Sequence, residues 1–449
     1  MSKRAATTTP ANPEILRGRV TALSYGPHAI IRHQGKVHFV RNAAPGDEID
    51  FRPREERGNH CFSDIVALVE AGPARHEAPC RWLPDCGGCP WQHVTPQAQA
   101  QAKQNNLRET LVRVGGFIEP PVEALLQPSS GFGYRRRLSL RVHDRQVGFH
   151  AADSHRLVAV DECLIAAPAL QGGIALAGGW VAGLRTRLSR IEVASVGDGD
   201  RIALVGQCDG ALVEQDLAAS DAFLRANPRL SALVLHGRGF RHVLGDDRIQ
   251  VPLERDLGIE VRAGDFTQVN DAGNRVLIET VLQLGAPSRS DVVADLYGGA
   301  GNFALPIARR AGSVHVVEHS QSAVQSGQNS ARHLGFTNAE FEQGDVGRVL
   351  RAWADAAPPS GKHFDLVVLD PPRSGAAEAV EPLLRLAPSR LVYVSCNPAT
   401  LARDLRALSV GYTIRQVVPI DLFPQTHHLE SVTLLTRTGI APPPAAARL

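Results

Sequence analysis

The sequence contains no apolar run long enough to cross a bilayer, which argues against a membrane-spanning helix. It also lacks the apolar core of a signal peptide, because its first residues read MSKRAATTTPAN. A strong net charge is missing too. The formal value is +2, so the total charge does not favour a nucleic-acid partner, although local clusters could. We therefore expect a cytoplasmic protein whose ends, residues 1–13 and 440–449, are disordered tails.

The chain is globular in composition but too long for a single core, with 449 residues, of which 43% are hydrophobic and 21% charged. Short apolar stretches broken by Gly, Pro and Asp predict a small β-barrel over residues 14–73. The pattern over 74–262 is mostly β, with one helix at 96–114 and another near 166–186. From 263 to 439, strands and helices alternate, which predicts an α/β domain with a parallel sheet. We expect the 96–114 helix to pack on that domain.

A glycine-rich turn follows a predicted strand in VVADLYGGAGN, residues 292–302. Its glycines let the backbone approach a ligand closely. Glu318 ends the next strand and could hold a pair of ribose hydroxyls, and Asp345 follows the third strand, where it could contact an adenine amino group. The GxGxxG pattern that binds a pyrophosphate is absent. We therefore favour S-adenosylmethionine over a nicotinamide dinucleotide as the ligand.

Three reactive side chains follow or adjoin predicted strands of the same domain. Cys396 lies in SCNP, directly after the apolar run at 391–394, and ligands bind beyond the carboxyl ends of such strands. It is placed to act as a nucleophile, although a free cysteine is more often a small buried apolar residue. Asp370 ends an apolar strand, where it could hydrogen-bond a substrate. Glu430 is a candidate proton-transfer partner, or else a surface or helix-cap carboxylate.

A second group of cysteines lies outside this domain. The pattern consists of Cys80, Cys86, Cys89 and, much later, Cys163. Four thiolates can ligate a [4Fe–4S] cluster, and disulfides are disfavoured in the cytoplasm. Zinc, with His93 replacing Cys163, is the alternative, and spacing alone favours it slightly because zinc is the commoner structural metal. Cys61 and Cys208 lie in apolar, strand-like contexts and are expected in the core.

A basic run, Tyr134-Arg135-Arg136-Arg137, precedes apolar residues that alternate with polar ones. This pattern predicts a strand with arginines on its exposed face, which could contact nucleic acid. A solvated edge strand protected by charge is an equally good interpretation.

Five ordered motifs together resemble the RNA uracil-C5 methyltransferase family. They are FTQVN at 266–270, DLYGGAGNF at 295–303, DPPR at 370–373, SCNP at 395–398 and HHLE at 427–430. The resemblance covers residues 14 to 437 and is greatest to the branch that acts on 23S ribosomal RNA. One departure is visible, because this chain has Tyr297-Gly298 where ribosomal members commonly have Phe-Cys.

The resemblance implies a TRAM β-barrel that binds RNA, a central β domain with a [4Fe–4S] cluster, and a C-terminal class I, Rossmann-like methyltransferase domain. It also implies a monomer that needs no membrane. By motif match, the residues that line the cofactor and target pocket are Gln268, Tyr297, Asn302, Glu318, Asp345 and Asp370. Cys396 matches the nucleophile and Glu430 the base. Cys80, Cys86, Cys89 and Cys163 match the cluster ligands.

Uracil C5 is a poor nucleophile until a thiolate adds at C6. The reaction of this family therefore needs a cysteine that adds to C6 and a base that later removes the proton from C5. The target base must also be flipped out of folded RNA. Three alternatives remain open. The same reaction on tRNA is less favoured because the barrel and the cysteine cluster point to ribosomal RNA. An amino-group methyltransferase could use Asp370-Pro371-Pro372 but needs no cysteine, and a non-catalytic RNA-binding protein need not keep all of these residues.

Overall fold

The computed structural model describes residues 14–83, 85–197, 199–356 and 363–440. Contacts divide the chain into two compact units. The first contains the described residues up to Leu107, together with His150–Val158 and Phe423–Leu429. The second contains Arg108–Phe149, Ala159–Leu422 and the residues from Glu430 onward. Apart from Ile440, the expected tails lie outside the described residues.

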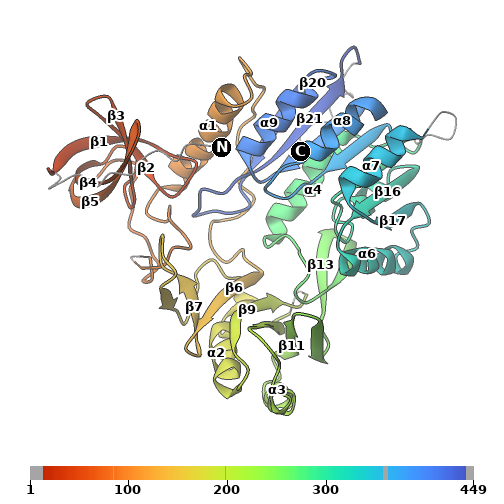
Figure 1. Ribbon diagram of the computed structural model, residues 1–449, viewed down its shortest axis with the longest axis horizontal. Helices are drawn as coiled ribbons and strands as arrows, with labels where there is room; N and C mark the ends of the chain where they lie inside the picture. The colour runs from red at the N-terminus through yellow and green to blue at the C-terminus, as the bar shows by residue number, and fades with distance from the viewer. Residues whose placement is uncertain (1–13, 84, 198, 357–362, 441–449) are drawn as a thin grey trace. The chain divides into compact units, whose positions relative to one another are not determined.

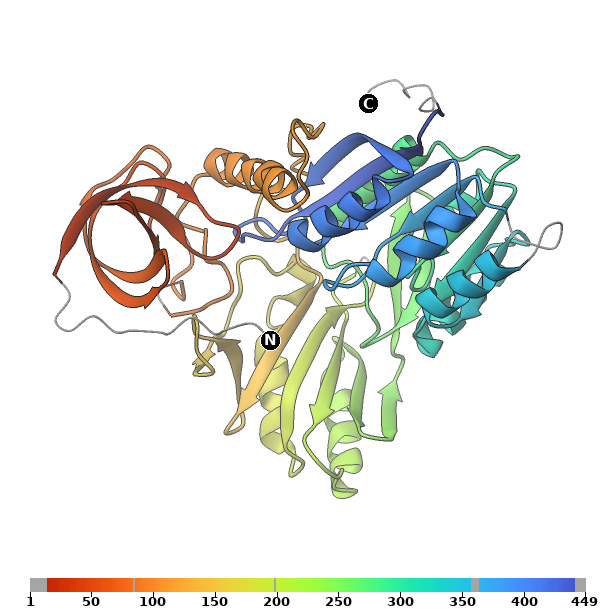
Figure 2. The ribbon, with the colours of Figure 1, turned by 45° about the horizontal axis from the view of Figure 1, so that its top comes forward.

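The first unit contains a closed five-stranded barrel, seen as a ring of red strands in Figure 2. The strands are β1 (Leu16–Leu23), β2 (Ala29–His33), β3 (Lys36–Val40), β4 (Glu48–Arg57) and β5 (His60–Glu70), paired in the order β1-β2-β3-β5-β4. Ile31, Ile49 and Phe51 are fully buried inside it, as expected where apolar residues alternate along strands. The buried Asp47 accepts hydrogen bonds from Gly72 N and from the Arg75 guanidinium, which fastens the chain that leaves the barrel. The predicted barrel is confirmed.

Helix α1 (Pro96–Arg113) agrees with the helix predicted at 96–114. Within the first unit, its Gln99 side chain donates to Gln425 Oε1 at 3.0 Å and accepts from Gln425 N at 3.0 Å. The buried Lys103 ammonium donates to the carbonyl of Phe423 at 3.1 Å. These contacts hold the segment Phe423–Leu429, which immediately precedes Glu430.

The central sheet of the chain has the order β12-β11-β10-β9-β6-β7-β8. Its strands are β6 (Arg137–His143), β7 (Gln146–His150), β8 (Leu157–Ala159), β9 (Leu188–Ser195), β10 (Ile202–Cys208), β11 (Leu230–Gly237) and β12 (Phe240–Gly245). Helices α2 (Gly173–Gly183) and α3 (Gln215–Ala226) pack on it, and α2 accounts for the helix predicted near 166–186. A separate hairpin follows, made of β13 (Arg248–Glu254) and β14 (Leu257–Arg262). Cys61 and Cys208 are buried, as predicted.

The third sheet has the order β17-β16-β15-β18-β19-β21-β20. Its strands are β15 (Val292–Leu296), β16 (Ser313–Glu318), β17 (Ala339–Gln343), β18 (Leu366–Leu369), β19 (Arg390–Ser395), β20 (Tyr412–Ile420) and β21 (Glu430–Arg437). The strands from β17 to β19 are parallel, whereas β21 runs antiparallel to both of its neighbours. The predicted α/β domain is confirmed. The strand order reverses between β15 and β18, where open sheets of this kind bind ligands.

Helices cover both faces of this sheet. They are α4 (Asp271–Gly285), α5 (Ala304–Ala308), α6 (Gln321–His333), α7 (Val346–Asp355), α8 (Ala377–Leu386) and α9 (Pro398–Leu408). Figures 1 and 2 show α7, α8 and α9 side by side on one face, with α4 on the other. Burial on both faces explains the continuous apolar runs of the strands. In the part of the chain that the structure describes, no helix is long and apolar enough to cross a membrane.

Candidate functional site

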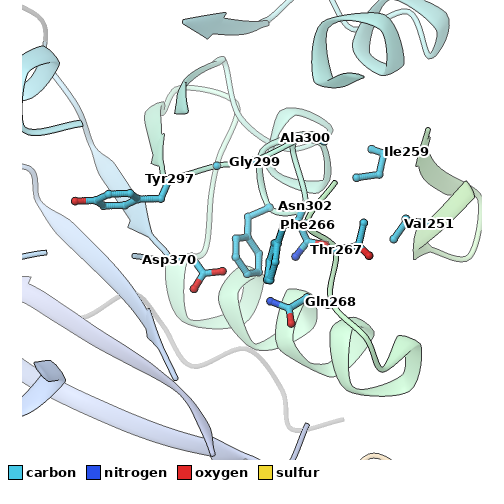
Figure 3. A pocket seen from close by; sticks show the side chains of 12 residues that line it. Val251, Ile259, Phe266, Thr267, Gln268, Tyr297, Gly299, Ala300, Asn302 and Asp370 are labelled. Atoms are coloured by element: carbon cyan, nitrogen blue, oxygen red, sulfur yellow. The ribbon is translucent and has the colours of Figure 1, made fainter. Parts of the chain in front are cut away.

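A pocket opens beyond the carboxyl end of β15 and encloses about 460 Å³ of space that is continuous with solvent. It is lined by Val251, Ile259, Phe266, Thr267, Gln268, Tyr297, Gly298, Gly299, Ala300, Asn302, Phe303 and Asp370. Figure 3 shows Gln268, Asn302 and Asp370 around it. Four predicted site residues therefore meet here: Gln268, Tyr297, Asn302 and Asp370. Val251 and Ile259 of the hairpin carried no sequence signal.

The glycine-rich turn follows β15, as predicted, and its backbone is closely packed against neighbouring side chains. A side-chain carbon at Gly298 would lie 2.5 Å from Val316 Cγ1 and 3.0 Å from the Asp295 carboxyl carbon. Gly301 has φ +97°, in the left-handed region that favours glycine. The turn thus needs glycine for close approach and for backbone conformation.

Tyr297 is a non-glycine residue at φ +60°. Its ring points away from Asn302 and Asp370 in Figure 3, and its hydroxyl donates to Glu378 Oε1 at 2.5 Å. Burial and the Glu378 carboxylate raise the Tyr297 pKa. Because Glu378 is on α8, this hydrogen bond ties the turn after β15 to the first turn of that helix.

Asn302 forms a reciprocal amide pair with Asn274, which is buried on α4. Asn274 Nδ2 donates to Asn302 Oδ1 at 2.8 Å, and Asn302 Nδ2 donates back to Asn274 Oδ1 at 3.0 Å. The pair fixes the rotamer of Asn302 at the pocket wall. Sequence reasoning missed Asn274, because its position on the helix face gives no signal without the fold.

Glu318 and Asp345 do not line the described pocket. Glu318 accepts hydrogen bonds from Gly299 N at 3.1 Å and from Ser320 N at 2.7 Å, so it braces the glycine-rich turn. Asp345 is the N-cap of α7 and accepts from Arg348 N at 2.9 Å. Their expected contacts with ribose and adenine remain predictions.

The motif SCNP forms the end of β19 and the start of α9. Asn397 caps the helix by accepting from Ala399 N at 3.0 Å, and Pro398 occupies the first turn. Asn397 Nδ2 also donates to the carbonyl of Arg373 at 3.1 Å. This contact links the turn at Cys396 to the loop that begins at Asp370.

Cys396, Asp370 and Glu430 lie close enough for their charges to interact. Burial, then Glu430 and Asp370, raise the Cys396 pKa to about 11, while the Arg373 guanidinium lowers it. Glu430 is 5% exposed, and burial followed by Asp370 raises its pKa well above the usual range. Burial also raises the pKa of Asp370. The three groups therefore hold protons readily, and Arg373, which sequence reasoning did not assign, opposes this at both Cys396 and Glu430.

The expected metal site is not found. Within the described ranges, no group of three or more His, Cys, Asp or Glu side chains could hold a metal ion. All four predicted ligands, Cys80, Cys86, Cys89 and Cys163, have intermediate exposure, and the last belongs to the second unit. The expected [4Fe–4S] cluster on these cysteines, and zinc with His93, are therefore not shown.

The sequence predicted that the arginines of the run at 135–137 lie on an exposed face, and this prediction is wrong for Arg136 and Arg137. Arg136 donates to Asp271 at 3.1 Å and to the carbonyl of Gly197 at 3.0 Å. Arg137 donates to the carbonyl of Asp265 at 2.8 Å. These guanidinium groups are half-buried and brace the segment that leads to the pocket.

Comparisons with known proteins give consistent matches. A family model described as tRNA (Uracil-5-)-methyltransferase matches residues 232–438. A protein of Pseudomonas putida named 23S rRNA (uracil(1939)-C(5))-methyltransferase RlmD is 38% identical over 415 residues, which cover 89% of each chain. A protein of the same name from Alcanivorax borkumensis is 33% identical and covers 95% of this chain and 97% of its own.

One solved structure is similar over nearly the whole chain. It is the Pyrococcus abyssi tRNA (uracil-54, C5)-methyltransferase in complex with S-adenosyl-L-homocysteine, with a TM-score of 0.73. The match covers 94% of this chain and 99% of that one, at 23% identity. At this identity the likeness shows the fold alone.

Proposed function

Because this chain belongs to the RNA (uracil-C5)-methyltransferase family, we propose that it methylates C5 of one uridine in 23S ribosomal RNA with S-adenosylmethionine as donor. The observation that carries the proposal is the grouping of Cys396, Asp370 and Glu430 beside the pocket after β15. The curated relatives that support 23S RNA as substrate cover about nine-tenths of the chain or more. The same reaction on tRNA is the second candidate, because the matching family model and the solved structure both carry tRNA in their names.

In the proposed mechanism, S-adenosylmethionine would supply an electrophilic methyl group: its bond between sulfur and the methyl carbon would break, and S-adenosyl-L-homocysteine would leave. The Cys396 thiolate adds to C6 of the flipped uracil and makes C5 nucleophilic, so that C5 can take the methyl group. Glu430 then removes the proton from C5. The C5–C6 double bond re-forms, the bond between sulfur and C6 breaks, and the thiolate is released. Asp370 would hydrogen-bond the uracil.

The local charges explain how the thiolate could form. Asp370 and Glu430 disfavour a negative sulfur, and Arg373 favours it. A bound sulfonium cation would act in the same direction as Arg373, because an opposite charge nearby stabilises the ionised form. The thiol would therefore be activated mainly when the donor is bound.

The rate of methyl transfer is expected to rise with pH between about 6 and 9. The pKa values of Cys396, Asp370 and Glu430 are all raised, that of Cys396 to about 11. The thiol therefore holds its proton at neutral pH, whereas the nucleophile and the base must be deprotonated to act. Single-turnover rates at saturating donor and RNA would measure this profile. A rate that falls over this range would contradict the assignment.

Tyr297→Phe should weaken binding of S-adenosyl-L-homocysteine about threefold to tenfold, because it deletes a charge-assisted hydrogen bond to Glu378 that holds the glycine-rich turn. Calorimetric titration would measure the affinity. The matched control is Tyr412→Phe, which deletes a hydroxyl that donates to the carbonyl of Pro388. Equal affinities in both variants would show that the Tyr297 contact does not shape the pocket.

Three further features remain proposals that rest on the family. The first is the division into a TRAM barrel at 14–73, a central domain at 74–262 and a methyltransferase domain at 263–439. The second is a [4Fe–4S] cluster on Cys80, Cys86, Cys89 and Cys163, for which the influence of Cys80 on the Cys86 pKa is the local support. Iron and sulfide analysis of protein purified without oxygen would test it. The third is a cytoplasmic monomer.

The decisive experiment incubates the purified protein with S-adenosylmethionine and unmodified transcripts of 23S RNA or tRNA. Mass spectrometry would then map 5-methyluridine. We expect one modified uridine, in 23S RNA only, at the position that corresponds to uracil 1939 in the names of the relatives. 5-Methyluridine in tRNA alone would contradict the assignment of 23S RNA as the substrate but would support the proposed reaction. A methylated exocyclic amino group would instead identify the alternative chemistry at Asp370.

A further inference from the structure

Five polar side chains lie in one cross-strand row of the central sheet. The register pairs Arg141 of β6 with Arg190 of β9, and Arg190 with Gln207 of β10. It then pairs Gln207 with His236 of β11, and His236 with Arg241 of β12. Directly paired residues point to the same face of a sheet. We call these five residues the basic row.

The basic row lies on the face opposite α2. A side-chain carbon at Gly206 would lie 3.3 Å from the ring of Trp180 on α2. Because successive residues of a strand face opposite sides, Gln207 and its partners in the row point away from this helix. Arg141, Gln207 and Arg241 are exposed, and the other two are half-buried.

The row carries more positive charge than nearby carboxylates neutralise. In the part of the chain that the structure describes, Arg141 and Arg190 form no ion pair with a carboxylate. Arg241 binds the buried Asp247 through one nitrogen at 2.6 Å. Burial, then Arg241 and Arg190, lower the His236 pKa, so two cations flank an imidazole that would gain its proton more readily beside a phosphate.

Besides Asp247, which binds Arg241, the carboxyl group of Glu192 lies near the row. Glu192 lies two residues from Arg190 on β9, and its pKa is raised by burial, while Arg137 and Arg190 lower it and Asp265 raises it. The Glu192 carboxylate is 3.7 Å from the Arg137 guanidinium, which is also 5.8 Å from the ring of Phe266.

The row adjoins the segment that enters the pocket. Val205 points to the same face as Gln207, and a carbon at Gly264 would lie 3.4 Å from it, so the chain at Gly264 lies over the sheet next to the row. Two residues later, Phe266 is 75% exposed at the pocket wall. The segment from Gly264 to Phe266 thus leads from the sheet beside the row to the pocket wall, within the second unit.

We propose that the basic row binds the phosphate backbone of the RNA strand whose uridine enters the pocket. The proposal rests on the function proposed above and adds to it the surface that holds the substrate. Four interstrand steps of about 4.8 Å give the row a length of about 19 Å, enough for several phosphates. Arginines that neutralise phosphates position a nucleic acid without reading its sequence.

The test compares Arg141→Gln/Arg190→Gln with Arg225→Gln, which removes one arginine of the same domain from α3. Arg225 forms an ion pair with Asp221 on that helix. The single variants Arg141→Gln and Arg190→Gln match this control in charge. Fluorescence titrations with a labelled 23S RNA transcript at several salt concentrations would give affinities, and calorimetry with S-adenosyl-L-homocysteine would show that the pocket is intact.

For the double variant we expect a loss of RNA affinity of about tenfold to a hundredfold at 0.1 M salt. The slope of log affinity against log salt should become shallower by about 1.5, while binding of S-adenosyl-L-homocysteine stays unchanged. RNA affinity equal to that of Arg225→Gln would overturn the proposal. So would a double variant that loses only its binding of an acidic peptide such as polyglutamate.

Failure of this proposal and failure of the proposed function give different results. Wild-type protein that methylates uracil, with row variants that bind RNA normally, would overturn the row alone. Wild-type protein that forms no 5-methyluridine, with row variants that still lose RNA affinity, would overturn the proposed reaction and leave the row as an RNA-binding surface.

Discussion

Cys396→Ala is expected to abolish 5-methyluridine formation, with a rate loss of about a thousandfold or more. Alanine removes the sulfur that must add to C6, and no other cysteine belongs to the described group around Asp370 and Glu430. The variant should bind S-adenosyl-L-homocysteine and RNA like the wild type, because the side chain is small and the cap at Asn397 is kept. A radiolabelled methyl-transfer assay would measure the loss.

The matched control is Cys208→Ala, since burial raises the Cys208 pKa to about 11, as it does that of Cys396. Cys208 lies in the central sheet, away from the pocket residues. A second readout uses RNA that contains 5-fluorouridine. Fluorine at C5 cannot leave as a proton does, so the wild type should stay covalently attached, and Cys396→Ala should form no adduct. Methyl transfer that survives Cys396→Ala would sink the covalent mechanism.

Glu430→Gln should reduce turnover about a hundredfold to ten-thousandfold, while one methyl transfer per enzyme still occurs. Glutamine keeps the shape of the side chain but cannot accept the C5 proton. The methylated RNA should therefore remain attached to Cys396, and a denaturing gel should show the adduct with ordinary uridine RNA. The two substitutions thus have opposite effects on adduct formation, which a merely structural role for either residue would not produce.

The control for Glu430→Gln is Glu381→Gln, a substitution of the same type on the exposed side of α8, where Glu381 lies near Arg385. It should leave turnover unchanged. If Glu430→Gln turns over normally, or loses activity without accumulating an adduct, the base must be sought elsewhere, and Asp370 would be the first residue to examine.

The sequence predicted the third sheet well because its strands are buried on both faces. Runs such as Leu366–Leu369 are apolar without interruption, and each ends in a polar residue or a turn. The same logic located Asp370 and Cys396 at one edge of the sheet before the strand order was known. The glycine-rich turn was equally visible, because close packing at Gly298 and the backbone at Gly301 demand glycine.

What the sequence could not show depends on contacts between distant segments. The sequence predicted that Arg136 and Arg137 belong to an exposed basic run. In the structure, Arg136 donates to the Asp271 carboxylate and to the Gly197 carbonyl, and Arg137 donates to the Asp265 carbonyl. All three partners are distant in the sequence. Asn274 holds Asn302 only because α4 passes beside the turn after β15. The cysteine spacing likewise identified possible ligands but could not fix where Cys163 would lie.

The antiparallel direction of β21 fixes where Glu430 lies relative to Cys396. Because β21 runs antiparallel to β19, its first residue, Glu430, lies next to the last residues of β19, where Ser431 Oγ donates to the carbonyl of Ser395 at 3.3 Å. A parallel strand would have put its first residue at the opposite edge of the sheet. A slip of one residue between these strands would move the carboxylate by about 3.3 Å and turn it to the other face. The spacing between the proposed base and the proposed nucleophile is therefore set by a ladder of backbone hydrogen bonds, and insertions within β21 should be poorly tolerated.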